Sequence, residues 1–169
     1  MPRKARERSA TGCYHIMGRG INHAAIYNDD ADNMNFLHIL DFCADEDFTI
    51  FAYCLMGNHF HLLAKADADV LQHVMKAVGI RYVAYFNRRY QRDGPLFRGR
   101  YNSQPVTTKG YFLRVLRYIH RNPVAAGIVQ EMQDYPWSSY LDYFGSRKKV
   151  LCQVDTSLCA CIAWLGMAA

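Results

Sequence analysis

The stretch FAYCLMGNHFHLLA, residues 51–64, decides the fold of this 169-residue chain. Two runs rich in aromatic and aliphatic residues flank Gly57-Asn58, a dipeptide typical of tight turns. The pattern therefore predicts a β-hairpin whose strands cover residues 48–56 and 59–65. Side chains alternate between the two faces of a strand, which would place both histidines of the second strand on the same face.

Segments outside the hairpin are expected to supply further strands and helices. The other strand-like segments are residues 14–19, a short apolar return at 24–27 and an extended stretch at 96–106. Helical spacing of apolar residues predicts three helices, over 33–45, 69–89 and 109–122. Asp32 and Thr108 are expected to cap the first and third helices, and Pro123 to end the third.

The order of these elements predicts the fold class. Strand, helix, strand, strand, helix, strand is the order of an α+β ferredoxin-like sandwich, an antiparallel sheet with helices packed on one face. The other face would be available for a ligand. We expect a basic flexible arm at residues 1–12, the main domain at 13–145, and a tail or covering segment at 146–169.

Composition narrows the class of protein. A hydrophobic fraction of 51% and an aromatic fraction of 14% indicate a packed globular domain. No apolar run approaches the roughly 20 residues that cross a bilayer, and the charged N-terminus lacks the apolar core of a secretory signal. Six scattered cysteines favour reduced thiols, and the cluster Cys152, Cys159 and Cys161 matches no usual zinc spacing. We expect a cytoplasmic protein with no membrane partner.

Charge is distributed unevenly along the chain. The net charge is +5, yet residues 28–47 carry seven acidic side chains and no Lys or Arg. Residues 76–121 carry eleven basic side chains and a single acidic one, Asp93. Such one-sided clustering is typical of a surface that binds a polyanion, so nucleic acid is the expected partner.

His59 and His61 are the first candidate functional residues. Two imidazoles on one strand face can ligate one metal ion when a third group arrives from elsewhere in the chain. A His-x-His pattern also arises by chance at this histidine content. The alternative interpretation is two half-buried strand histidines that hydrogen-bond to their neighbours.

The predicted helix 109–122 carries the second group of candidates. Its apolar stripe is Phe112, Val115, Leu116 and Ile119. Tyr118 falls on the flank of that stripe, with Asn122 one turn later and Arg114 one turn earlier. Tyr118 is either an amphipathic boundary residue or a nucleophile, and forming a phenolate at neutral pH costs about 4 kcal/mol without help. A metal held by His59, His61 and Asn122 would polarise the phosphate under attack.

Several motifs in order give the chain a family resemblance. They are MGNHFHLL at 56–63, FNRR at 86–89, GPLFRGRY at 94–101, RYIHRNPV at 117–124 and YPWSSY at 135–140. Over about residues 12–145 the chain resembles the single-tyrosine HUH transposases, which are also called IS200-like transposases. Within that group it more closely resembles the REP-associated tyrosine transposases of bacteria. The resemblance implies an enzyme that cuts and rejoins single-stranded DNA at hairpin sequences of the REP type.

The resemblance also implies roles for particular residues. Tyr118 falls on the position of the nucleophile, which forms a 5′-phosphotyrosine and leaves a free 3′-hydroxyl. His59, His61 and Asn122 fall on the positions that hold a divalent metal, Mg or Mn, with Asn122 standing where many relatives carry Gln. A catalytically idle regulator that binds DNA hairpins is the alternative function, and a relative of replication initiators or relaxases is a weaker one.

Contacts with DNA are expected from basic and aromatic side chains. The expected DNA-binding residues are Arg98, Arg100, Arg114, Arg117 and Arg121. Phe97 and Tyr101 are candidates for stacking on unpaired bases, although either side chain also suits the core. The arm with Arg3, Lys4, Arg6 and Arg8 is a candidate for tracking the DNA backbone. A monomer is favoured over a homodimer.

Overall fold

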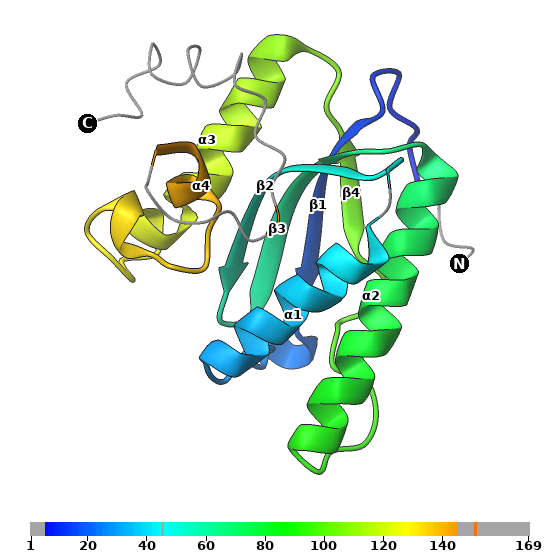
Figure 1. Ribbon diagram of the computed structural model, residues 1–169, viewed down its shortest axis with the longest axis vertical. Coiled ribbons are helices and arrows are strands. Elements are labelled where there is room, and N and C mark those ends of the chain that lie inside the picture. Colours follow the sequence, from blue (N-terminus) through cyan, green and yellow to red (C-terminus); the bar gives the residue numbers. More distant parts are fainter. Residues whose placement is uncertain (1–5, 45, 145–150, 152–169) are drawn as a thin grey trace.

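Four strands form one antiparallel sheet in the computed structural model, which describes residues 6–44, 46–144 and 151 (Figure 1). The strands are β1 (Cys13–Arg19), β2 (Thr49–Met56), β3 (His59–Lys65) and β4 (Asn102–Pro105), and their spatial order is β2-β3-β1-β4. One helix follows β1 and another follows β3, which is the ferredoxin-like arrangement. The predicted α+β class and the predicted hairpin are confirmed.

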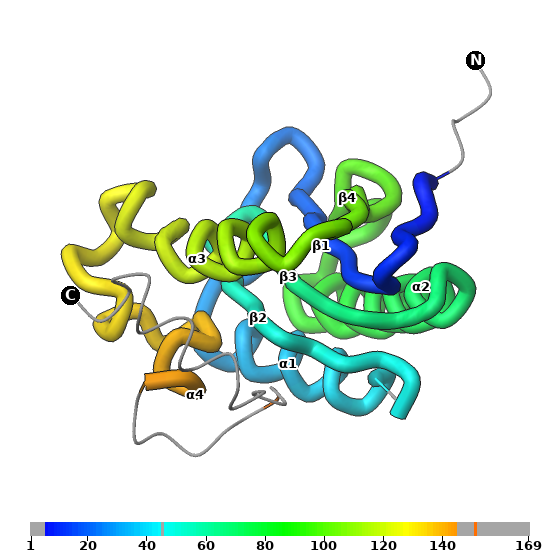
Figure 2. Tube along the Cα trace, turned by 90° about the horizontal axis from the view of Figure 1, so that it is seen from above, coloured from blue at the N-terminus to red at the C-terminus, as the bar shows by residue number. Residues whose placement is uncertain are grey.

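Two helices, α1 (Asp30–Cys43) and α2 (Ala68–Arg89), cover one face of the sheet (Figure 2). Phe60 and Leu62 of β3 point to this side and join the larger core cluster, together with Phe36 of α1 and Tyr82 of α2. Each of these side chains is at most 3% exposed, so each contributes about 1.5–3 kcal/mol of transfer free energy.

A third helix, α3 (Lys109–Ala125), lies on the opposite face, where Figure 2 shows it across the sheet from α1 and α2. Its buried Val115, Leu116 and Ile119 pack against Cys54 of β2 and Leu63 of β3. The expectation that helices pack on one face only is therefore wrong for α3. The physical reason is that β2 and β3 are apolar on both faces, so the second face also needs a cover. α3 lies mainly over β2 and β3.

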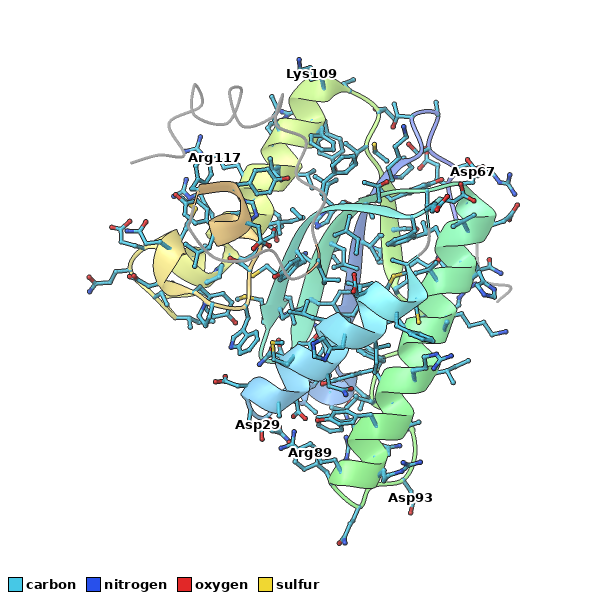
Figure 3. The ribbon with its side chains drawn as sticks, viewed as in Figure 1. Asp29, Asp67, Arg89, Asp93, Lys109 and Arg117 are labelled. Carbon is cyan, nitrogen blue, oxygen red and sulfur yellow. The ribbon has the colours of Figure 1, made fainter. Side chains whose placement is uncertain are left out.

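The start of α1 differs from the expectation. Asp29, not Asp32, caps the helix, because its side chain accepts a hydrogen bond from the backbone N–H of Asp32. Asp32 is fully buried and its carboxylate accepts hydrogen bonds from Arg89 at 2.7 Å and Tyr90 at 2.8 Å. Arg89 also pairs with Asp29 at 2.6 Å, and Figure 3 shows these two side chains together at one end of α1 and α2. The ion pairs of Arg89 with Asp29 and Asp32 thus hold the start of α1 against the end of α2.

Two other expected boundaries also change. Thr108 caps α3 as predicted. The helix does not end at Pro123 but continues to Ala125. Backbone N–H groups after the proline still donate hydrogen bonds within the helix; that of Ala126, for example, donates to the carbonyl of Asn122. Residues 24–27 form no strand. Ile26 donates to the carbonyl of Gly57 after a short 3₁₀ turn, η1 (Ile21–His23).

The chain after α3 folds back over β2. It contains a 3₁₀ turn, η2 (Met132–Asp134), and a short helix, α4 (Tyr140–Phe144). Ser139 lies between β2 and α3: its hydroxyl accepts from the backbone N–H of Tyr53 at 2.9 Å and hydrogen-bonds to His120 Nε2 at 2.8 Å. The segment therefore fixes α3 to the sheet two residues away from Tyr118.

Some predicted features lie outside the described residues: Arg3 and Lys4 of the arm, the tail at 146–169 apart from Leu151, and the cluster Cys152, Cys159 and Cys161. None of the helices in the described part of the chain has the length and apolar character that a membrane span requires.

Candidate active site

The site forms where α3 crosses the sheet face that carries the two histidines. β3 begins at His59 directly after the turn, so His59 and His61 both face α3. The Tyr118 ring packs edge-on against the His61 ring, with the two centroids 5.5 Å apart and the ring planes at 86°. The structure therefore brings the predicted histidine pair and the predicted tyrosine together within one chain.

A cavity of about 470 Å³ opens beside these three side chains. Tyr118 is 51% exposed, so its ring is reachable from solvent. Three cationic residues, Arg19, Arg98 and Arg100, also line the cavity, and none of its described lining residues is acidic. The loop that carries Arg98 is held against β1 by the hydrogen bond from its backbone N–H to the carbonyl of Arg19, at 2.9 Å. The cavity thus suits a phosphate group.

His15 is a third histidine at the site. It lies on β1, which pairs with β3 so that Met17 is opposite His61, and its side chain is only 5% exposed. His15 Nε2 lies 3.1 Å from His61 Nδ1, and the His15 ring packs against Tyr118 with the centroids 5.8 Å apart. No local sequence pattern marks His15 or Arg19 as site residues, because the register of β1 against β3 brings them to the site.

Hydrogen bonds orient the rings of His59 and His61. The side-chain oxygen of Asn58 lies 2.6 Å from His59 Nδ1, and since an amide oxygen can only accept, that nitrogen donates. His61 Nδ1 is engaged with His15. In the described part of the chain, the Nε2 atoms of His59 and His61 have no hydrogen-bond partner. This leaves the Nε2 lone pair of His59 free for a ligand, and that of His61 free in the tautomer whose Nδ1 donates to His15.

Burial keeps these rings neutral. It lowers the pKa of His15 to about 4. For His61 burial, reinforced by the charges of His15, His59 and Arg19, lowers the pKa to about 3. Burial and then Arg19 also lower the pKa of His59. At neutral pH the imidazoles are therefore unprotonated, which is the state that binds metal.

The donor set fits a divalent metal with two protein nitrogens. The described residues contain no group of three or more His, Cys, Asp or Glu side chains that would enclose an ion. Asn122 lies one turn after Tyr118, and its amide nitrogen donates to the Tyr118 carbonyl at 2.9 Å. Asn122 is not among the residues that line the cavity, so its role as a third ligand stays a prediction.

The predicted DNA-binding arginines divide into two sets. Arg98 and Arg100 line the cavity beside Tyr118. Arg114, Arg117 and Arg121 are exposed along α3 and do not line it; Figure 3 places Arg117 toward the α4 side of the molecule.

The two candidate stacking residues also differ. Phe97 is partly buried and packs against the core, with its ring 6.2 Å from that of Phe60. Tyr101 is half-buried, and the guanidinium of Arg6 lies 3.8 Å from its ring centroid.

Comparisons with known proteins give a consistent result. The sequence model of a family described as "Transposase IS200 like" matches residues 9–122. A solved structure of a REP-associated tyrosine transposase bound to a REP hairpin matches 92% of this chain and 93% of its own, with a TM-score of 0.66 and 15% identity. A putative transposase from Deinococcus radiodurans R1 matches 72% of this chain and 95% of its own, at a TM-score of 0.43 and 19% identity. No curated protein sequence matches the chain.

Proposed function

This chain belongs to the IS200-like transposase family, and on that premise we propose that it cleaves and rejoins single-stranded DNA with Tyr118 as the nucleophile. The observation that carries the proposal is the exposed Tyr118 ring packed against His61 at a cavity with three arginines. A tyrosine that served only as a boundary residue would not need two buried histidines and a cationic wall beside it.

The proposed reaction exchanges one phosphodiester for another. The Tyr118 oxygen attacks the scissile phosphorus, and the bond from phosphorus to the 3′ oxygen of the preceding nucleotide breaks. The phenol gives up its proton, and the departing oxygen takes one up, so the products are a 5′-phosphotyrosine and a free 3′-hydroxyl. A 3′-hydroxyl that attacks the phosphotyrosine rejoins the strand. Arg98 and Arg100 hold the phosphate in place and offset its negative charge.

His59 and His61 would hold the divalent metal, Mg or Mn, through their Nε2 atoms. When bound, the ion supplies positive charge that polarises the phosphate under attack. Imidazole ligands favour Mn over Mg. Asn58 and His15 orient the two rings by their hydrogen bonds, and we propose Asn122 as a third ligand from the same helix as Tyr118.

The proposed substrate is a DNA hairpin of the REP type next to a single-stranded segment. The fold shared with the REP-associated tyrosine transposase, whose structure contains a REP hairpin, supports this choice. The one-sided charge of residues 76–121 supports a polyanionic ligand.

The experiment that tests the reaction traps its intermediate. The protein is incubated with end-labelled hairpin oligonucleotides and Mn, then denatured, and the covalent adduct is separated by electrophoresis. We expect an adduct with the native protein, none with Tyr118→Phe, and an undiminished adduct with the control Tyr111→Phe on the same helix. Hairpin binding without any adduct would instead identify a catalytically idle regulator.

We propose that the monomer is the active form. Tyr118, His59 and His61 meet within one chain, which supports a site formed without a second copy. Mixing His61→Ala with Tyr118→Phe should therefore leave adduct formation absent. Recovery of activity in the mixture would show that the tyrosine acts on a partner's histidines.

A further inference from the structure

A second cavity, of about 340 Å³, lies on the opposite side of the sheet from Tyr118. α2 forms one wall and the loop at 97–101 forms another. Three residues, Gly18, Gly99 and Arg100, belong to the walls of both this cavity and the one beside Tyr118. Because β4 begins only at Asn102, it does not pair with the Gly18 end of β1, and the two cavities meet around this part of the sheet edge.

The lining of this second cavity combines aromatic surfaces with cations. Phe97 and Tyr101 contribute partly buried rings, and Arg6, whose guanidinium lies 3.8 Å from the Tyr101 ring centroid, contributes positive charge together with Lys76 and Arg100. The Tyr101 hydroxyl is buried and has no hydrogen-bond partner among the described residues. Aromatic faces next to basic side chains are the combination with which proteins bind unpaired bases.

Two glycines, Gly18 and Gly79, line this cavity. A Cβ at Gly18 would lie 2.3 Å from the Phe60 ring, so only glycine lets that ring lie against β1. Gly79 stands inside α2, where glycine costs about 1 kcal/mol relative to alanine. A Cβ at Gly79 would meet no atom within 4 Å, so packing does not require the glycine there. Gln72, Met75 and Gly79 fall on one stripe of α2 that faces the cavity.

We propose that this cavity receives an unpaired nucleobase of the DNA strand whose phosphate lies beside Tyr118. The proposal rests on the proposed function, because it takes the strand in the Tyr118 cavity as its starting point. Arg100, which lines both cavities, would contact the connecting phosphate. The volume lies at the lower end of the range for small-ligand pockets, which suits one base with its sugar better than a longer segment.

The test uses one pair of substitutions in the complete chain. Gly79→Leu extends a side chain over the preceding turn of α2 and into the cavity, whereas Gly79→Ala leaves the cavity open. Both replace a helical glycine, so both variants should unfold at the same temperature as the native protein or higher. The probes are an oligothymidylate of about ten nucleotides and an abasic strand of the same length and charge.

The native protein and Gly79→Ala should bind the oligothymidylate about tenfold more tightly than the abasic strand. Gly79→Leu should bind both strands equally, at the affinity of the native protein for the abasic one. The fluorescence of a 2-aminopurine placed within the oligothymidylate should be quenched by the native protein and unchanged by Gly79→Leu. An unaltered preference for bases in Gly79→Leu would overturn the proposal, as would native protein that binds both strands equally.

The adduct experiment separates this proposal from the proposed function. If Tyr118 forms its adduct and Gly79→Leu retains the preference for bases, the nucleobase site is wrong and the reaction stands. If Gly79→Leu loses that preference and no adduct forms on any hairpin, the cavity binds bases in a protein that does not cleave DNA.

Discussion

Replacing His15 by Phe tests the hydrogen bond that orients His61. The substitution keeps a ring of similar size but removes the nitrogen that lies 3.1 Å from His61 Nδ1. His61 is only 3% exposed, so water does not readily replace the lost partner. An unsatisfied buried donor costs about 1–3 kcal/mol, which corresponds to about fivefold to 150-fold in an equilibrium constant. Outer-shell partners of metal-binding histidines contribute about tenfold to 100-fold to metal affinity, which agrees with that range.

Calorimetric titration with Mn measures this effect directly. We expect His15→Phe to bind Mn at least tenfold more weakly than the native protein, and His15→Gln to recover part of the loss because its amide restores a hydrogen-bonding group. His38→Phe, an exposed histidine on α1, is the control and should bind normally. Nitrogen NMR of the metal-free protein should show His61 protonated at Nδ1, and a mixture of tautomers in His15→Phe. Affinity within twofold of the native value in His15→Phe would refute the reasoning.

Three further predictions concern stability and DNA binding. Asp32→Ala removes a fully buried carboxylate that four groups bond to, so the free energy of unfolding should fall by about 3–5 kcal/mol, whereas exposed Asp41→Ala should change it little in denaturant titrations. Burial lowers the pKa of His120 to about 3, and the unfolded imidazole titrates near 6.5. The unfolded state therefore binds more protons between these values, and this histidine alone should contribute a fall in stability of about 2 kcal/mol from pH 7 to pH 5, a contribution that His120→Gln should lack. Arg98→Gln should reduce the slope of log affinity against log salt by about 1, whereas Arg88→Gln, on a surface away from the cavity, should not.

The hairpin and the helix with Tyr118 could be predicted because their signals are local. Alternation along 59–65 assigned His59 and His61 to one face, and the helical spacing of Val115, Leu116 and Ile119 placed Tyr118 on a flank. Both patterns depend only on backbone geometry within a single element. The structure confirms both placements.

The parts of the site that could not be predicted depend on how elements meet. His15 and Arg19 reach the cavity through the pairing of β1 with β3, and no local pattern specifies that register. The position of α3 on the second face follows from the apolar character of both faces of β2 and β3. Asp32 was expected as a cap, because the tertiary contact with Arg89 that draws its side chain inward leaves no local signal.

The two hydrogen bonds that the Ser139 hydroxyl makes, with Tyr53 and with His120, determine where the chain can be shortened. The family match ends at residue 122, so Ser139 lies outside the matched residues. A fragment cut there would lack the Ser139 hydroxyl that joins His120 of α3 to Tyr53 of β2, and α3 itself would end three residues early. The fragment would also lose the buried Tyr135 from the core cluster beneath α3, so it should unfold at a lower temperature than the complete chain.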